Sequence, residues 1–311
     1  MTRRIRAAIS DPLFAFKFIS RRANRRYYEA VARKRVESRS TDVFAEEWDN
    51  LIILDACRFD AFKRYHDLPG TLQHRYSPGA MTREFLEANF AGRQLHDTVY
   101  VTANPMFYRH RDRLGTSFHA TIDVWQDDGW DSEHRTVLPE TMTRYATEAA
   151  ERFRDKRIIV HYIQPHFPFV GAETRLDKRL PDPAAGETSF WDDITFSRAD
   201  ISDRLIRRSY VENLQVALPH VRELMEALSG LTVVTSDHGN MLGERSFPIP
   251  IKEYGHPPGI YSEELTKVPW LVFDDGPRRE TTASDGGTHS EDSDAEVAER
   301  RLKQLGYLSA E

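Results

Sequence analysis

The sequence predicts an α/β protein, a three-layer αβα sandwich around a mostly parallel central sheet. Five short apolar runs are separated by helical or loop sequence, and their continuous hydrophobicity is typical of strands covered on both faces. The runs are residues 51–54, 99–101, 158–160, 231–234 and 268–273. Residues 139–154 and 203–228 have helical character, and we expect Pro219 to bend or interrupt the second helix.

The composition indicates a folded chain without disulfides. Of its 311 residues, 40% are hydrophobic and 11% aromatic, which supports a packed core rather than a disordered chain. Cys57 is the single cysteine, so neither an intrachain disulfide nor a cysteine-based zinc cluster can form. The net charge of -6 is modest and identifies no partner.

The chain shows no sign of a membrane span or a secretory signal. Its apolar runs are far shorter than the ~20 residues that cross a bilayer, and the N-terminus lacks the charged, apolar and small-residue succession of a signal peptide. We therefore expect a cytoplasmic location, peripheral to a membrane at most.

Positive charge is concentrated at the N-terminus. Residues 1–35 carry eleven Lys and Arg against Asp11 and Glu29, a net charge of +9. Phe14, Phe16 and Phe18 are interleaved with these cations, a composition suited to docking on an anionic membrane surface. The alternative is a segment packed on its own domain, and the alternating phenylalanines are compatible with a strand as well as a helix. No nucleic-acid motif accompanies the arginines, so no nucleic acid is expected.

The sequence divides into four parts. We expect a basic N-terminal segment over 1–45, the main domain over 46–273, a disordered acidic linker over 274–294, and a C-terminal helix within 295–311 that packs on the domain. Residues 171–200 are predicted to form a long surface loop.

Two of the predicted strands end in residues that can bind a metal ion. Asp55 follows the first apolar run, and Asp237 and His238 follow the fourth. Ligands of α/β sheets collect at the carboxyl ends of the strands, and a carboxylate placed there needs a cation or a donor to stay charged.

These segments resemble the sulfatase and alkaline phosphatase superfamily. The first strand with its Asp-Ala-Cys-Arg-Phe-Asp ending, a Pro-His-x-Pro segment, an Asp-His-Gly-x-x-x-Gly-Glu signature and a late histidine segment occur in the expected order. They cover residues 50–60, 162–169, 236–244 and 254–269, and the chain ending at 301–308 is also similar. The resemblance implies an alkaline-phosphatase-like sandwich and a metal-dependent enzyme that cleaves or transfers phosphate or sulfate esters.

The superfamily attacks phosphorus or sulfur with a metal-activated hydroxyl or formylglycine downstream of the first Asp. Thr82 stands where a helix could begin, and the N–H groups of a helix N-terminus stabilise an alkoxide or a bound oxyanion. We favour Thr82 over Ser77 as the nucleophile, although Thr82 could equally be an ordinary helix cap.

The sequence departs from the formylglycine sulfatases at the residues that define them. Neither Cys57 nor Ser77 begins the Cys/Ser-x-Pro/Ala-x-Arg motif that is converted to formylglycine. The segment around Pro165 also lacks the Asp and His that two-zinc members use for a second ion. The chain is therefore more similar to single-metal members such as lipoteichoic acid synthases and phosphoethanolamine transferases, whose ligand set would correspond to Asp55, Thr82, Asp237 and His238.

Four further side chains are candidates for substrate contact. His166 and His256 are expected to contact the substrate's oxygens or protonate the leaving group. Arg58 and Arg83 could clamp a phosphate, or could pair with neighbouring acids such as Asp60 and Glu84. His161, inside the third run, is interpreted as structural.

The sequence thus predicts a metal-dependent hydrolase or transferase of phosphate esters with a Thr nucleophile and one Mn²⁺, Zn²⁺, Mg²⁺ or Ca²⁺ ion per chain. Its substrate is a phosphate or sulfate ester, with a glycan or lipid-linked ester compatible with the resemblance. A sulfuric ester hydrolase, a two-metal phosphodiesterase and a non-catalytic protein that binds an anionic glycan remain as alternatives.

Overall fold

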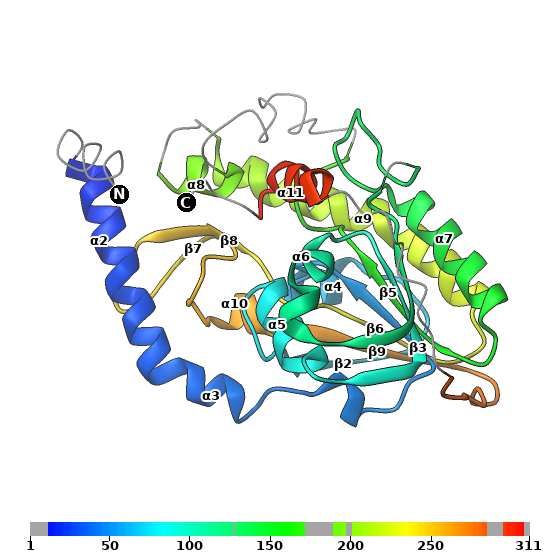
Figure 1. Cartoon of the computed structure of the whole chain (residues 1–311). Coiled ribbons are helices and arrows are strands. Elements are labelled where there is room, and N and C mark those ends of the chain that lie inside the picture. Colours follow the sequence, from blue (N-terminus) through cyan, green and yellow to red (C-terminus); the bar gives the residue numbers. More distant parts are fainter. Residues whose placement is uncertain (1–11, 127, 172–188, 197–200, 285–294, 308–311) are drawn as a thin grey trace.

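A seven-stranded sheet forms the centre of the protein, with helices on both faces (Figure 1). The computed structural model describes residues 12–126, 128–171, 189–196, 201–284 and 295–307. The strand order is β2-β9-β6-β1-β5-β3-β4, and β9 alone runs antiparallel to its neighbours. The strands are β1 (Asn50–Leu54), β2 (Thr71–Tyr76), β3 (Gln94–Thr102), β4 (Ser117–Asp123), β5 (Arg157–Tyr162), β6 (Gly230–Thr235) and β9 (Lys267–Asp275).

Helices account for most of the remaining described structure. The main ones are α4 (Phe59–Tyr65), α5 (Thr82–Phe90), α6 (Met106–Leu114), α7 (Pro139–Arg152), α8 (Phe190–Thr195), α9 (Asp203–Ala227), α10 (Glu263–Thr266) and α11 (Ala295–Gln304). The helix α9 continues through Pro219, contrary to the expected interruption. Pro219 and Gln215, whose carbonyl loses its helical donor to the proline, both lie on the exposed face, where water can hydrate that carbonyl.

The central strand β1 shows how the two faces of the sheet are covered. Ile52 and Leu54 belong to the core on the side of α7 and α9, whereas Leu51 and Ile53 belong to the core on the side of α5 and α6. All four are fully buried. Successive side chains of a strand point to opposite faces, so a continuous apolar run is what a sheet between two helical layers requires. The predicted three-layer sandwich is confirmed.

All five predicted strands lie in this sheet, but two of its members were not predicted. They are β2 and β4, the two edge strands. The strand β2 is exposed or half-buried along its whole length and therefore carries no continuous apolar run. Edge strands are commonly short of apolar residues because one side faces water.

The N-terminal segment is helical and packs on a second, small sheet. It comprises α2 (Pro12–Tyr27), a π-helical turn η1 (Tyr28–Ala32) and α3 (Arg33–Glu37), and the small sheet is the hairpin of β7 (Met241–Arg245) and β8 (Lys252–Gly255). Phe14 is buried against Phe196, with ring centroids 4.7 Å apart. The alternation of phenylalanines thus does not form a strand.

Polar contacts hold α2 on the hairpin. The buried Asn24 side chain donates to Ser246 Oγ and to the Ile249 carbonyl, both at 2.8 Å, and accepts the Ile249 N–H at 2.9 Å. Arg21 Nε lies 2.9 Å from Glu253 Oε2, and Arg21 Nη1 lies 3.1 Å from Asp192. The helix α2 is therefore fixed to the hairpin of β7 and β8.

Two predicted irregular regions contain ordered residues. The predicted loop over 171–200 includes α8, while residues 172–188 and 197–200 lie outside the described residues. Within the predicted linker, Arg278 pairs with the buried Asp49 at 2.9 Å, and the Lys156 ammonium donates to the Thr282 carbonyl at 2.9 Å. Residues 285–294 lie outside the described part of the chain.

The buried Glu253 gives a pH-dependent prediction for stability. Its side chain is fully buried, and burial raises the pKa of its carboxyl to about 7, with Arg21 acting in the opposite direction. A folded pKa above the unfolded value means that the associated stability is complete below pH 4.5 and is lost as the pH rises to about 7. The loss is at most about 3 kcal/mol.

Glu253→Gln should therefore remove part of the fall in melting temperature between these pH values. The measurement is thermal unfolding across that pH range, compared with the wild type and with Glu280→Gln, which removes an exposed carboxyl. A pH profile of Glu253→Gln parallel to that of the wild type would contradict the prediction.

Candidate metal centre and nucleophile

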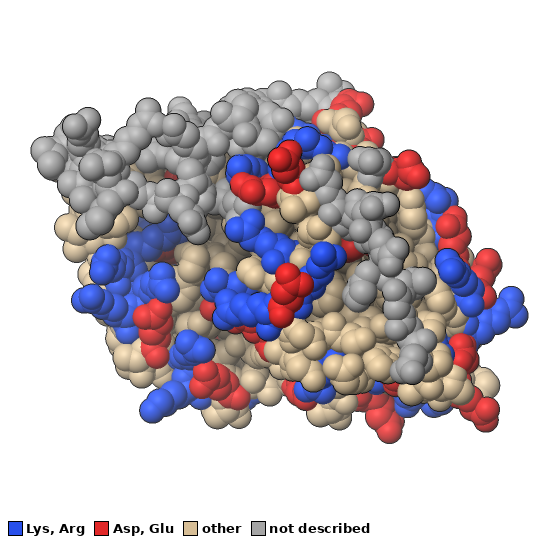
Figure 2. All heavy atoms as spheres, viewed as in Figure 1, with Lys and Arg blue, Asp and Glu red and all other residues tan. Residues whose placement is uncertain are grey.

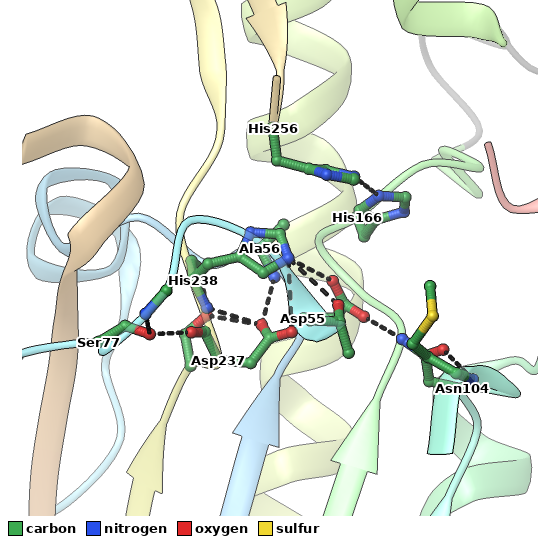
Figure 3. A network of polar contacts seen from close by, with 12 residues as sticks. Asp55, Ala56, Ser77, Asn104, His166, Asp237, His238 and His256 are labelled. Atoms are coloured by element: carbon green, nitrogen blue, oxygen red, sulfur yellow. Dashed lines mark hydrogen bonds and ion pairs between the residues drawn. The ribbon is translucent and has the colours of Figure 1, made fainter. Parts of the chain in front are cut away.

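Acidic and histidine side chains meet at the carboxyl ends of three neighbouring strands. The strands β6, β1 and β5 lie side by side and parallel, and they position Asp237, Asp55 and His161 respectively. Because parallel strands end at the same edge of a sheet, residues distant in sequence are brought together there. Figure 3 shows Asp55, Asp237 and His238 pointing toward one another.

Each carboxylate uses one oxygen for protein hydrogen bonds, and its other oxygen has no hydrogen-bond partner among the described residues. Asp55 Oδ2 accepts from Asn104 Nδ2 at 2.7 Å and from the Tyr307 hydroxyl. Asp237 Oδ1 accepts the backbone N–H groups of Ala56 at 3.1 Å and His238 at 2.8 Å. Asp55 Oδ1 and Asp237 Oδ2 are buried without a hydrogen-bond donor among the described residues.

The turn after β1 is strained to reach Asp237. Ala56 has φ of 58°, in the left-handed region that residues with a Cβ rarely adopt. Its N–H donates to Asp237, and its carbonyl accepts from the Tyr210 hydroxyl at 2.7 Å. Backbone strain of this kind, on the order of 1 kcal/mol or more, is commonly found where it positions a functional group.

The two carboxylates destabilise each other's charge. Burial and the neighbouring Asp237 raise the pKa of Asp55 well above its usual value, and burial raises the pKa of Asp237. Both side chains are fully buried. Two adjacent buried carboxylates cannot both remain ionised without a cation between them.

Two histidines complete the ring of ligand atoms. His161 Nε2 lies 3.7 Å from Asp55 Oδ2 and 3.8 Å from Asp237 Oδ2. His238 Nε2 lies 3.7 Å from Asp55 Oδ1 and 3.4 Å from Asp237 Oδ2. Burial lowers the pKa of each imidazole to about 4, so both are neutral near pH 7.

The distances between these nitrogens and carboxylate oxygens are closer to those between two ligands of one metal ion than to those of direct hydrogen bonds. Donors about 2.1 Å from a tetrahedral ion lie about 3.4 Å apart, whereas hydrogen-bonded atoms lie about 2.9 Å apart. His238 Nδ1, 2.7 Å from the Gly239 carbonyl, must carry the proton of the neutral ring, which leaves a lone pair on Nε2. Asp55, His161 and Asp237 thus form a buried group that could hold a divalent metal ion.

Thr82 begins α5 beside this group. Its hydroxyl lies 3.2 Å from His238 Nε2, and the side chain is buried. Ser77, the other candidate, donates its hydroxyl to the backbone carbonyl of Asp237 and accepts the Gly79 N–H at 3.3 Å. The Ser77 hydroxyl is therefore used in holding the loop, whereas the Thr82 hydroxyl faces the ligand atoms.

His166 and His256 form a pair of histidines next to His238. Their Nε2 atoms are 2.9 Å apart, and the rings of His256 and His238 are 4.9 Å apart (Figure 3). His166 Nδ1, 2.6 Å from the Phe167 carbonyl, carries the proton of that ring, so His256 donates to His166. His256 Nδ1 is then a buried acceptor without a hydrogen-bond partner among the described residues. Tyr307 stacks on His166 at 4.6 Å.

The two arginine candidates lie in ion pairs. Arg58 contacts Asp60 at 2.6 Å and Glu244 at 2.7 Å, and its side chain is 8% exposed. Arg83 lies 3.8 Å from Glu87 and is 43% exposed. The pairing of Arg58 with Asp60 is the alternative left open by the sequence. The pairing of Arg58 with Glu244 links the turn after β1 to β7.

Three residues of the site were missed or interpreted differently from the sequence. His161 was interpreted as structural, yet its Nε2 faces both carboxylates without a hydrogen-bond partner among the described residues. A histidine within an otherwise apolar strand was the available signal. Asn104 and Tyr307 were not singled out, because nothing near them in the sequence shows that they reach Asp55.

Comparison with known proteins gives matches in structure only. No family model matches the chain, and no curated protein matches it in sequence. Among solved structures, the C-terminal periplasmic domain of phosphoethanolamine transferase EptC from Campylobacter jejuni is 18% identical with a TM-score of 0.45, and the match covers 72% of this chain and 78% of that one.

Two further structures are similar. The corresponding EptC domain from Escherichia coli, in complex with zinc, is 13% identical with a TM-score of 0.47, covering 73% of this chain and 72% of that one. An alkaline phosphatase superfamily protein from Vibrio parahaemolyticus is 13% identical with a TM-score of 0.45, covering 84% and 67%. The last of these structures is of the superfamily that the sequence motifs resemble.

The expected cytoplasmic location was wrong. The matched EptC structures are periplasmic domains, which contradicts the expectation drawn from the N-terminal sequence. None of the helices within the described ranges combines the length and the apolar character needed to cross a bilayer.

The carboxylate pair predicts an unusual response to Asp237→Asn. In chelator, the variant should melt a few degrees higher than the wild type, because the wild type must either bury two adjacent charges or protonate one carboxylate, and a neutral amide avoids both costs. The added amide can also donate to Asp55 Oδ1, which has no partner among the described residues. The variant should lose the rise in melting temperature that a divalent metal gives the wild type.

Asp123→Asn is the matched control, because Asp123 is a half-buried carboxyl whose pKa burial also raises, to about 6. It lies at the end of β4, outside the ligand group, and should keep the metal-induced rise. Wild-type stabilisation of Asp237→Asn by metal would contradict the assignment of this site.

Proposed function

We propose that the chain is a metal-dependent enzyme that cleaves or transfers phosphate esters through a covalent intermediate on Thr82. One observation carries the proposal: the Thr82 hydroxyl lies 3.2 Å from His238 Nε2, beside two carboxylates that each keep one oxygen free of hydrogen bonds from the described residues. The proposed ligands are Asp55, Asp237 and His238 with the Thr82 oxygen, and His161 supplies a further nitrogen facing both carboxylates.

The surroundings of Thr82 suit a nucleophile. Thr82 is the first residue of α5, where backbone N–H groups without helical acceptors favour negative charge. A divalent ion bound at this position supplies Lewis-acid activation of the hydroxyl and neutralises charge on the ester oxygens. Burial strengthens these electrostatic interactions because little water competes with them.

The reaction proceeds in two displacements. The Thr82 hydroxyl gives up its proton as its oxygen bonds to phosphorus and the ester P–O bond breaks, and the departing alkoxide takes up a proton. Water or an acceptor alcohol then loses a proton as it attacks the phosphothreonine, and the Thr82 oxygen takes up a proton as its bond to phosphorus breaks. His256 Nδ1, an acceptor without a hydrogen-bond partner among the described residues, could take up one of these protons and return it.

Phosphate esters are favoured over sulfate esters by the candidate nucleophiles. Cys57 is fully buried, and burial raises the pKa of its thiol well above the usual value. The Ser77 hydroxyl is held by a backbone carbonyl. Neither residue is placed to become a formylglycine, so an unmodified threonine is the available nucleophile.

A single ion is favoured over two. The pair of His166 and His256 could contribute nitrogens to a second ion, but neither ring forms an ion pair with a carboxylate of the described residues. A second divalent ion held by two neutral imidazoles would lack the anionic ligands that the first site provides. The pair is better suited to transferring a proton beside the first site.

Thr82→Ala should abolish turnover while the fold and the metal content are retained. The expected fall in kcat/KM on an aryl phosphate or a phosphodiester is at least about 10³-fold, as is typical when a nucleophile is removed. A trapped phosphoryl adduct, detected by mass spectrometry, should map to Thr82 in the wild type and be absent in the variant.

Two variants and a substrate panel sharpen this test. Thr82→Ser should keep part of the activity, and Ser77→Ala should not abolish the adduct. The panel includes phosphoethanolamine esters and sulfate esters, assayed with different divalent metals. Unchanged turnover in Thr82→Ala would contradict the nucleophile, and no turnover of any ester by the metal-loaded wild type would favour a non-catalytic binding protein.

A further inference from the structure

The outward side of α2 combines apolar and cationic side chains. Phe16, Ile19, Arg22, Ala23 and Arg26 are all exposed, and we refer to them as the outer face of α2. They are three or four positions apart and so share one side of the helix, opposite the buried Phe14, Ser20 and Asn24.

The large exposed apolar residues of the described chain gather around this helix. Six such side chains are exposed by more than a third, including Phe16 at 55% and Ile19 at 65%. All six lie on α2, on η1 or in the turn between β7 and β8, and Phe247 of that turn contacts Tyr27 with ring centroids 5.1 Å apart. The six are Leu13, Phe16, Phe18, Ile19, Val31 and Phe247.

The same surface is strongly cationic although the chain as a whole is acidic. Residues 12–37 contain eight Lys and Arg against two Glu, a net charge of +6, whereas the whole chain carries -6. Both glutamates are neutralised, Glu29 by Arg25 at 2.7 Å and Glu37 by Arg33 at 2.9 Å. Figure 2 shows Lys and Arg side chains gathered over α2 and α3.

We propose that the outer face of α2 binds the surface of an anionic lipid bilayer, with the helix lying parallel to the membrane plane. Phe16 and Ile19 would enter the boundary between headgroups and acyl chains, and Arg22 and Arg26 would contact lipid phosphates. The helix of 16 residues is about 24 Å long, enough to place all these side chains in the interface together.

A bilayer fits this face better than a protein partner does. The apolar side chains alternate with arginines that have no ion-pair partner among the described residues, whereas the buried centre of a protein interface is depleted in charge. At a membrane the long arginine side chains can extend to the phosphates while their stems remain among apolar groups.

The docking would also set the orientation of the reactive site. The helix α2 is fixed to the hairpin by Asn24 and Arg21, and β8 of that hairpin leads directly to His256. A bilayer bound to α2 would therefore lie on the side of the molecule formed by α2 and the hairpin that leads to His256. The proposal concerns binding and does not depend on the phosphoryl-transfer activity.

The test is sedimentation of the full chain with phosphatidylcholine vesicles, with and without phosphatidylglycerol. The wild type should bind the anionic vesicles at least tenfold more tightly, and added salt should weaken this binding. Phe16→Asp with Ile19→Asp, and separately Arg22→Glu with Arg26→Glu, should each reduce the affinity for anionic vesicles at least tenfold.

Arg144→Glu with Arg152→Glu on α7 makes the same charge change at exposed positions elsewhere and should bind as the wild type does. Circular dichroism and metal-induced stabilisation establish that each variant is folded. Equal binding of the wild type to both vesicle types, or wild-type binding by the α2 variants, would overturn the proposal. Lipid-independent dimerisation that Phe16→Asp with Ile19→Asp abolishes would also overturn it, because the face would then be a protein interface.

Discussion

The structure depends on the enclosure of two carboxylates, Asp55 and Asp237, at the ends of neighbouring strands. In water two such groups repel each other weakly, but in a buried site the repulsion and the loss of hydration are both large. The fold nevertheless keeps both side chains fully buried and raises the pKa of each. A cation resolves this conflict, so the same arrangement that destabilises the metal-free protein would give the site its affinity for metal.

The surrounding residues determine which oxygens of the two carboxylates stay available to bind a metal ion. Asn104 and Tyr307 occupy one oxygen of Asp55, and two backbone N–H groups occupy one oxygen of Asp237. These groups lie in the loop after β3, the C-terminal segment, the strained turn at Ala56 and the loop after β6. The site is therefore a product of the whole sheet, and Tyr307 gives the C-terminal segment a direct part in orienting Asp55.

The sequence reveals the parts of this site that lie on strand ends but not those that complete it. An aspartate directly after an apolar run could be placed near another such aspartate, because parallel strands share an edge. Asn104 and Tyr307 depend on the strand order and on the return of the C-terminus, which no local pattern encodes. His161 was interpreted as structural because a histidine in a buried strand commonly bonds a neighbour, as it does here with Tyr100 at 2.8 Å. Its second nitrogen, which faces the two carboxylates, had no signal of its own in the sequence. The edge strand β2 lacked the apolar run on which strand prediction relies.

The helix α2 and the site that holds the carboxylates are linked through β8 and His256, so the proposed membrane binding and the proposed chemistry would share one connected framework. The claim on which the account rests is the metal position. Anomalous diffraction from crystals soaked with Zn²⁺ or Mn²⁺ measures it directly. The account predicts one strong peak per chain, among the free oxygens of Asp55 and Asp237 and the Nε2 atom of His238. A peak only between His166 and His256, or none near the carboxylates, would contradict it.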